Sequence, residues 1–241
     1  MSAALPRIAA ADPAIFDLAA AELRDLNATL QALPPDTNET AWTVLNPRGA
    51  HAVAVGITAP VAVTIEGHVG YYCAGMNSGA SITINGNAGT GVAENMMSGT
   101  VHVRGDASQS AGATAHGGLL IIDGNASARC GISMKGVDIV VKGSVGHMSA
   151  FMAQSGSLVV LGDSGGALGD SIYEAHLYVR GQVGSLGADC CEKPLRDQHK
   201  QELRALLDAA GIDASVKVEH FKRYGSARTL YNFHIDNAGA Y

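Results

Sequence analysis

GDASQSAGATAHGGLLIIDGNASARCGISMKGVDIVVKG (residues 105–143) contains two consecutive copies of a nineteen-residue unit and begins a third. Each copy opens with a glycine, and the same spacing continues in both directions without an insertion or deletion. The glycines of the full set are Gly67, Gly86, Gly105, Gly124, Gly143, Gly162 and Gly181. A fixed period of this kind is the signature of a repeat architecture, in which each unit contacts mainly its neighbours.

Aliphatic residues alternate with other residues ahead of each glycine. The second residue before it is always isoleucine or valine, and the fourth is Val63, Ile82, Val101, Leu120, Ile139, Leu158 or Leu177. A period of two indicates a strand with one buried face, and nineteen residues with glycine at a fixed place are too few for two helices. We therefore predict an all-β fold, a single-stranded right-handed parallel β-helix of about seven coils with helical or irregular caps. The period alone leaves its handedness open.

Two further rows of equivalent positions refine this prediction. We assign the seven glycines to corners of the coil, where a positive φ would favour glycine. Seven positions later only alanine or glycine occurs, which predicts a place where the coil bends inward. The residues just before successive glycines include Arg104, Asp123 and Lys142, whose charges alternate and predict a favourable ladder on an outward, solvated face.

The flanks are expected to cap the exposed ends of the stack. Residues 1–60 form an N-terminal cap, with a short amphipathic helix within 13–33 and an irregular opening coil at 42–57. Residues 61–193 are the β-helix. Residues 194–241 hold a capping helix, which we expect to start near Pro194 and end at Gly211, followed by an aromatic tail.

Composition excludes several classes of function. A net charge of −6 without a basic patch argues against nucleic-acid binding. No apolar run is long enough to span a membrane, and the N-terminus lacks a signal-peptide core, so we expect a cytoplasmic protein. The four cysteines lack the spacing of zinc or iron–sulfur sites, and we expect them to be free thiols.

The registers contain no aligned catalytic set. The sequence lacks a P-loop and a nucleophile elbow, and its histidines never share a register on adjacent coils, so we assign no catalytic residue and no metal ligand. Asp170 and Asp189 are neighbours in one register, either as exposed acids or as a pair sharing a cation or proton. Four methionines, Met76, Met96, Met134 and Met152, are interpreted as corner packing or as an adaptable contact surface.

The aromatic tail is the candidate partner interface. Aromatic residues mixed with arginine are typical of interface hot spots, and the segment has no repeat to stack on. Its candidate residues are Phe221, Tyr224, Arg228, Tyr231, Phe233 and Tyr241. The alternative is that the tail folds back along the side of the rod.

The motifs between the glycines carry a family resemblance that spans nearly the whole chain. GHVGYYCAGMNSGA (67–80), ARCGISMKG (128–136), LGDSIYEAHLYVRG (168–181) and RYGSARTLYNFHIDNAGAY (223–241) resemble the GXGXG β-helix family of glutamate synthase. Within it, they are most similar to the β-helix chains of N-methylglutamate synthase (methylamine–glutamate N-methyltransferase). The long stretches without glycine make this resemblance more specific than the repeat alone.

The resemblance implies a structural subunit of a cytoplasmic complex that makes N-methyl-L-glutamate and ammonia from L-glutamate and methylamine. Its partners would be a class II amidotransferase-like subunit and a synthase-like subunit with FMN and an iron–sulfur cluster. This chain would bind no cofactor itself. Two alternatives remain: a scaffold like the β-helix chain of formylmethanofuran dehydrogenase, and a stand-alone β-helix enzyme.

Overall fold

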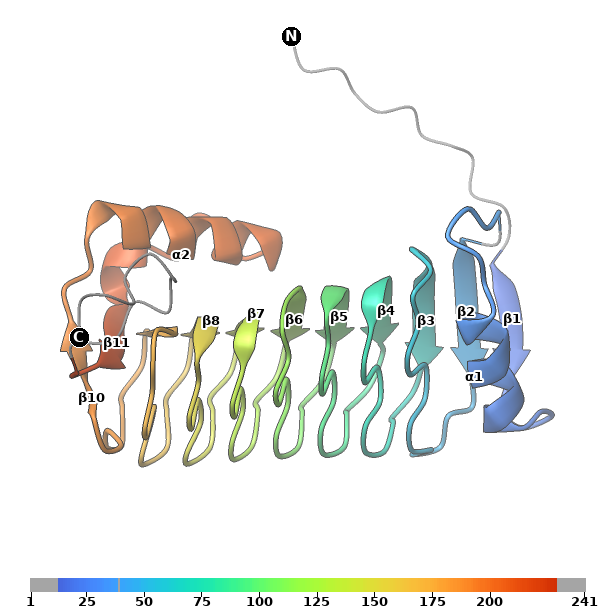
Figure 1. Cartoon of the computed structure of the whole chain (residues 1–241), viewed down its shortest axis with the longest axis horizontal. Helices are drawn as coiled ribbons and strands as arrows, with labels where there is room; N and C mark the ends of the chain where they lie inside the picture. Colours follow the sequence, from blue (N-terminus) through green and yellow to red (C-terminus); the bar gives the residue numbers. More distant parts are fainter. Residues whose placement is uncertain (1–12, 39, 229–241) are drawn as a thin grey trace, which may run out of the picture.

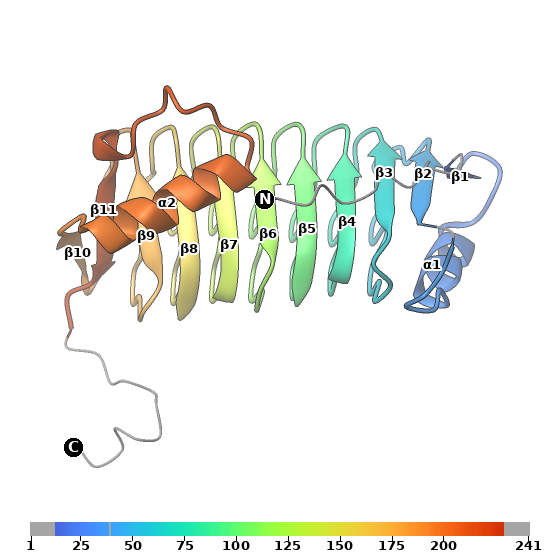
Figure 2. The same ribbon diagram turned by 90° about the horizontal axis from the view of Figure 1, so that it is seen from above.

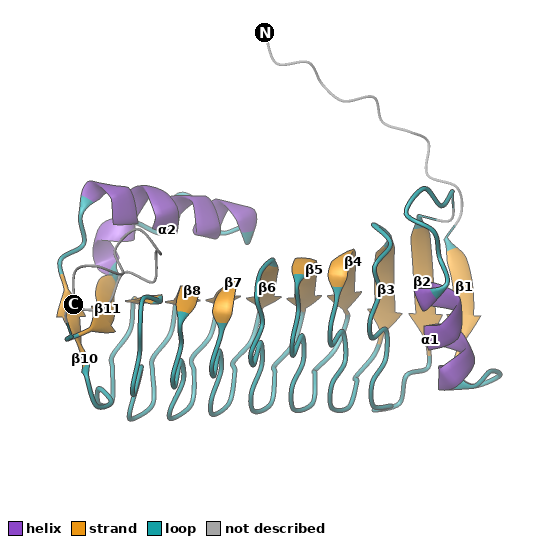
Figure 3. Ribbon diagram, viewed as in Figure 1, coloured by secondary structure: helices purple, strands orange, loops and turns teal. Residues whose placement is uncertain are grey.

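The computed structural model describes residues 13–38 and 40–228 as a rod of stacked coils (Figure 1). Each repeat contributes one strand to a long parallel sheet, and loops form the rest of the coil (Figure 3). The repeat strands are β3 (Ala62–Glu66), β4 (Ser78–Ile84), β5 (Ser98–Val103), β6 (Leu119–Ile122), β7 (Lys135–Val141), β8 (Ser155–Val160) and β9 (His176–Val179). The predicted parallel β-helix is confirmed.

The register of the sheet follows the nineteen-residue period. Ile65 lies opposite Ile84, which lies opposite Val103, and the same step continues to Val179. The two aliphatic rows face inward and are almost fully buried, so like residues stack on like through the core. Burying each large aliphatic side chain contributes about 1.5–3 kcal/mol, which makes these rows the main source of stability.

The row of small residues lies at a bend of the coil that is buried in the core. Ala74, Ala93 and Ala150 are fully buried and have φ near +56°, a left-handed conformation that costs alanine about 1 kcal/mol. Backbone hydrogen bonds between coils offset this cost, for example from Ala74 N–H to the Val53 carbonyl at 2.9 Å. Small side chains are needed here because the backbone of the bend already occupies this part of the core.

The corner glycines recur in the repeat for a different reason from the one predicted. Among the seven, only Gly67 has a positive φ, at +133°. At Gly124 a Cβ would lie 2.9 Å from the carbonyl oxygen of Gly105 and would also meet the Asp106 side chain. Successive coils approach closely at this corner, and it is this contact that excludes a side chain.

Two polar ladders run along the outside of the rod. Asp123 forms ion pairs with Lys142 at 2.7 Å and Arg104 at 3.4 Å, as the alternating charges predicted. The residues just after the glycines do more than face solvent. Each side chain from His68 to Asp163 accepts a hydrogen bond from the backbone N–H of the next coil, at 2.7–2.9 Å.

The N-terminal cap is more regular than predicted. β1 (Ala14–Asp17) and β2 (Ala41–Leu45) are further parallel strands of the same sheet, and Trp42 pairs in register with Val63. The irregular part of the expected opening coil is therefore confined to the residues after β2. The predicted helix is α1 (Leu23–Gln31), whose Leu26 and Leu30 are fully buried in the core at this end.

The C-terminal segment departs from the prediction. β10 (Cys190–Lys193) is followed by α2 (Asp197–Ala209), which starts three residues after Pro194 and stops just before Gly211, and then by a 3₁₀ turn (Val218–His220). β11 (Lys222–Ser226) next inserts between β9 and β10 and pairs antiparallel with both. The tail therefore does have a strand to stack on. No helix among the described residues is long and apolar enough to cross a membrane.

Candidate functional site

α2 lies across the outer face of the sheet over β6–β9 (Figure 2). Side chains three positions before the glycines point outward from the sheet, and those of the last four repeats lie beneath α2. At the N-terminal end of the rod these are Thr64, Thr83 and His102, whereas under α2 they are Ile121, Val140, Val159 and Tyr178. Leu203 and Leu207 of α2 and Ala210, which follows it, belong to this second apolar cluster, as do Leu161, Ile212 and Phe221. This change from polar to apolar residues in one register is visible in the sequence and marks the part of the sheet that α2 covers.

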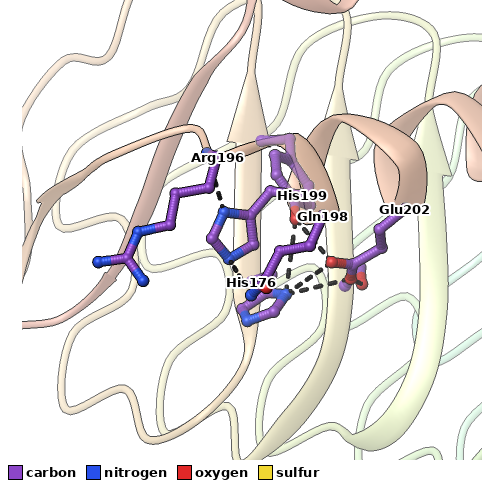
Figure 4. Close-up of polar contacts among 7 residues, drawn as sticks. His176, Arg196, Gln198, His199 and Glu202 are labelled. Carbon is purple, nitrogen blue, oxygen red and sulfur yellow. Dashed lines mark hydrogen bonds and ion pairs between the residues drawn. The ribbon is translucent and has the colours of Figure 1, made fainter.

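A polar cluster centred on Glu202 lies under the first half of α2 (Figure 4). The Glu202 carboxylate accepts hydrogen bonds from Ser157 Oγ at 2.8 Å and from Tyr178 Oη at 2.8 Å. It also lies 2.9 Å from His176 Nδ1, with which it forms an ion pair when the imidazole is protonated. Two strands and a helix thus meet at one carboxylate.

The electrostatics of the cluster favour an ionised Glu202. Partial burial by itself raises the pKa of Glu202, but hydrogen bonds from His176, Ser157 and Tyr178 outweigh that effect and lower the pKa to about 2. Burial raises the pKa of Tyr178, and its hydrogen bond to Glu202 raises the pKa further. The neighbouring Asp138 has a raised pKa, first from burial and then from the charge of Glu202.

His199 ends the cluster on the side of the helix start. Its Nδ1 accepts a hydrogen bond from the backbone N–H of Arg196 at 3.1 Å, which satisfies one donor at the N-terminus of α2. Its ring stands edge-on to that of His176, with centroids 5.4 Å apart. Burial lowers the pKa of His199, and the charges of Arg223 and His176 lower it further, so the accepting neutral form is favoured.

The Glu202 carboxylate has the properties of a structural contact between α2 and the sheet. A general base needs a pKa near the working pH, and the pKa of Glu202 is far below it. Its lone pairs are already used by three donors, and Tyr178 is held in its protonated, donating form. The cluster therefore fixes the position of α2 on the sheet.

Replacing Glu202 by glutamine is expected to lower stability at pH 7 by about 1–2 kcal/mol, because charge-assisted hydrogen bonds at a partly exposed carboxylate are lost. The folded pKa lies below the unfolded value, so this contribution is present above pH 4.5 and disappears as the pH falls toward 2. The raised pKa of Asp138 works in the opposite direction. Urea unfolding across pH 2–7 should give a free energy of unfolding that depends less on pH for E202Q than for the parent. The exposed control E22Q should keep the pH dependence of the parent.

Only part of the predicted interface is available to a partner. Phe221 and Tyr224 are 3% and 5% exposed, Phe221 in the cluster beneath α2 and Tyr224 against the main core. Arg228 is exposed but forms an ion pair with Asp189. Tyr231, Phe233 and Tyr241 lie outside the described residues. The prediction that Phe221 and Tyr224 meet a partner is wrong, because the chain itself covers both.

The cysteines, the methionines and Asp170 were the other residues of interest in the sequence. All four cysteines are free thiols, and burial raises the pKa of Cys73 and Cys130 to about 12, which makes them unreactive. Met96 and Met134 are buried as core packing, whereas Met76 and Met152 are 47% and 40% exposed. Asp170 accepts hydrogen bonds from the Ser171 hydroxyl and from the backbone N–H of Ala188, and it does not pair with Asp189. Within residues 13–38 and 40–228, no cluster of histidine, cysteine or acidic residues could hold a metal.

A curated protein is similar to almost the whole chain. The chain is 63% identical over 227 residues to protein GlxC of Rhizobium meliloti (strain 1021). The aligned region covers 94% of this chain and 99% of that protein. No protein-family model matches the sequence.

Proposed function

Because this chain belongs to the family of protein GlxC, we propose that it is the structural β-helix component of a glutamate-synthase-like complex. The observation that carries the proposal is the uninterrupted stack of glycine coils, whose motifs resemble the GXGXG β-helix of glutamate synthase over nearly the whole chain. A rod of this kind is a rigid spacer, since each coil is bonded to the next along its length.

The finer proposal concerns the reaction. The complex would convert L-glutamate and methylamine to N-methyl-L-glutamate and ammonia in the cytoplasm. An amidotransferase-like subunit and a synthase-like subunit with FMN and an iron–sulfur cluster would carry the chemistry, and this chain would hold them in register. The Glu202 cluster is consistent with a supporting role, because it ties a helix to the sheet and holds Glu202 in its ionised form.

Affinity purification of the tagged full chain from its native cells tests this proposal. We expect the two named subunits to co-purify, with flavin absorbance, and the complex to form N-methyl-L-glutamate from glutamate and methylamine. A stable monomer without partners would contradict the scaffold role. A complex with other activity, such as formyl transfer, would retain the scaffold role but contradict the proposed reaction.

A further prediction places the contact with the partners. Deleting residues 229–241 removes the three candidate aromatics that lie beyond the described part and spares every described strand and helix. We expect the truncated chain to melt like the full chain but to lose its partners in the same purification. A truncated chain that still assembles would place the interface on the rod itself.

A further inference from the structure

Two adjoining hollows lie at the C-terminal end of the rod, beside the start of α2. Their volumes are about 450 and 270 Å³, and they share His176, Lys193 and Arg223. The larger one is lined by Pro194, Arg196, Gln198 and His199 as well, and the smaller one extends to Arg228 and Ser226. The larger hollow falls within the range of about 300–1,000 Å³ that is typical of small-molecule sites.

The lining is cationic although the protein is acidic. The net charge of the chain is −6, yet four lysine or arginine residues line these hollows against a single carboxylate, that of Glu174. Arg228 is already neutralised by Asp189. Lys193, Arg196 and Arg223 form no ion pair with any residue in the described parts of the chain. Three unpaired positive charges therefore outnumber the single carboxylate of the lining.

The carboxylate of Glu202 does not neutralise these positive charges. Glu202 is held by Ser157, Tyr178 and His176, and Figure 4 shows the Arg196 side chain extending away from it. Asp197, in the first turn of α2, points into solvent and is 95% exposed. The positive end of the helix dipole thus adds to the potential at the hollow.

Arg223 is fixed in place by the sheet. It lies on β11 opposite Tyr178 of β9, and its Nε is buried without a hydrogen-bond partner among the described residues. Its charge and a hydrogen bond to Tyr178 lower the pKa of that residue against the stronger effect of burial, so the guanidinium is held beside the Tyr178 hydroxyl. A guanidinium held in this way is preorganised for a planar oxyanion.

We infer that these hollows form a binding site for a small oxyanion, a free carboxylate or phosphate compound. Arg223 of β11, Lys193 of β10 and Arg196, which precedes α2, would supply its positive charge. The site is separate from the proposed scaffold role, and neither depends on the other.

Titration of the full chain with succinate and with inorganic phosphate, followed by calorimetry and by NMR shifts of amides near Arg196, tests this inference. We expect saturable binding, and at least a tenfold weaker affinity in the double variant K193Q/R196Q. The matched control R24Q/K217Q removes the same charge from exposed positions elsewhere and should bind like the parent.

Three outcomes would overturn the inference. Sodium chloride at equal ionic strength could produce the same shifts, which would reduce the effect to screening. The control could lose affinity as much as K193Q/R196Q does, which would make it a matter of net charge. The isolated chain could bind neither anion while K193Q/R196Q loses its partner proteins, in which case the occupant is a carboxylate of a partner protein.

Discussion

The substitution Gly124→Val is expected to lower the melting temperature by about 6–12 °C, corresponding to a loss of about 3 kcal/mol in the free energy of unfolding. The added Cβ would lie 2.9 Å from the Gly105 carbonyl oxygen, so the two coils must move apart. It would also displace the Asp106 carboxylate, which accepts the backbone N–H of Asn125 at 2.7 Å. One substitution thus disturbs both the stack and the ladder on its outer side.

The alanine variants of Gly124 and Gly225 separate this contact from the general effect of replacing glycine. Neither position has a positive φ, and a Cβ at Gly225 would make only ordinary contacts, at 3.7 Å or more. We expect Gly124→Ala to be clearly destabilised and Gly225→Ala to change by less than about 1 kcal/mol. Differential scanning calorimetry measures both. Equal melting temperatures would show that the coils can separate without cost.

Deletion of residues 221–241 is expected to destroy the C-terminal end of the rod. The deletion removes β11, which pairs with β9 and β10, together with the buried Phe221 and Tyr224. Losing a buried aromatic side chain typically costs about 3–5 kcal/mol, and here two are lost along with their strand. Because whole domains are stable by only about 5–15 kcal/mol, the last coils and α2 should unfold.

The exposed edge of β9 should then cause aggregation, since an unpaired strand next to an open core is a template for other chains. Size-exclusion chromatography and circular dichroism measure this, with the deletion of 229–241 as the matched control. We expect the shorter deletion to remain monodisperse and folded. If the longer deletion eluted and melted like the full chain, the role of β11 in closing the stack would be wrong.

The inward-facing rows of the strands could be predicted from the period. Ile65, Ile84 and Val103 recur at a fixed spacing, and a repeat whose inner face is buried has only one register that keeps these side chains inside. The Arg104–Asp123–Lys142 ladder follows from the same register. The reason for the corner glycines was mistaken, because a period shows where glycine is needed but not whether φ or a neighbouring coil requires it.

The candidate site could not be predicted in this way. Ser157 and Glu202 are 45 residues apart and belong to different parts of the chain, so no period relates them. The role of the tail does not follow from its composition either, because aromatic and arginine residues suit a partner surface and a closing strand equally well. Composition does not distinguish whether Phe221 is covered by another protein or by α2 of its own chain.

What the sequence by itself determined is the parallel β-helix, its core rows and its period, because every coil repeats the same local pattern and the same contacts with its neighbours. The tertiary structure alone decided how the rod ends. There the chain reverses, β11 enters the sheet antiparallel, and α2 crosses the coils to place Glu202 over Ser157 and His176. These contacts occur once, and their energies depend on how distant segments fit together, which no repeat can specify.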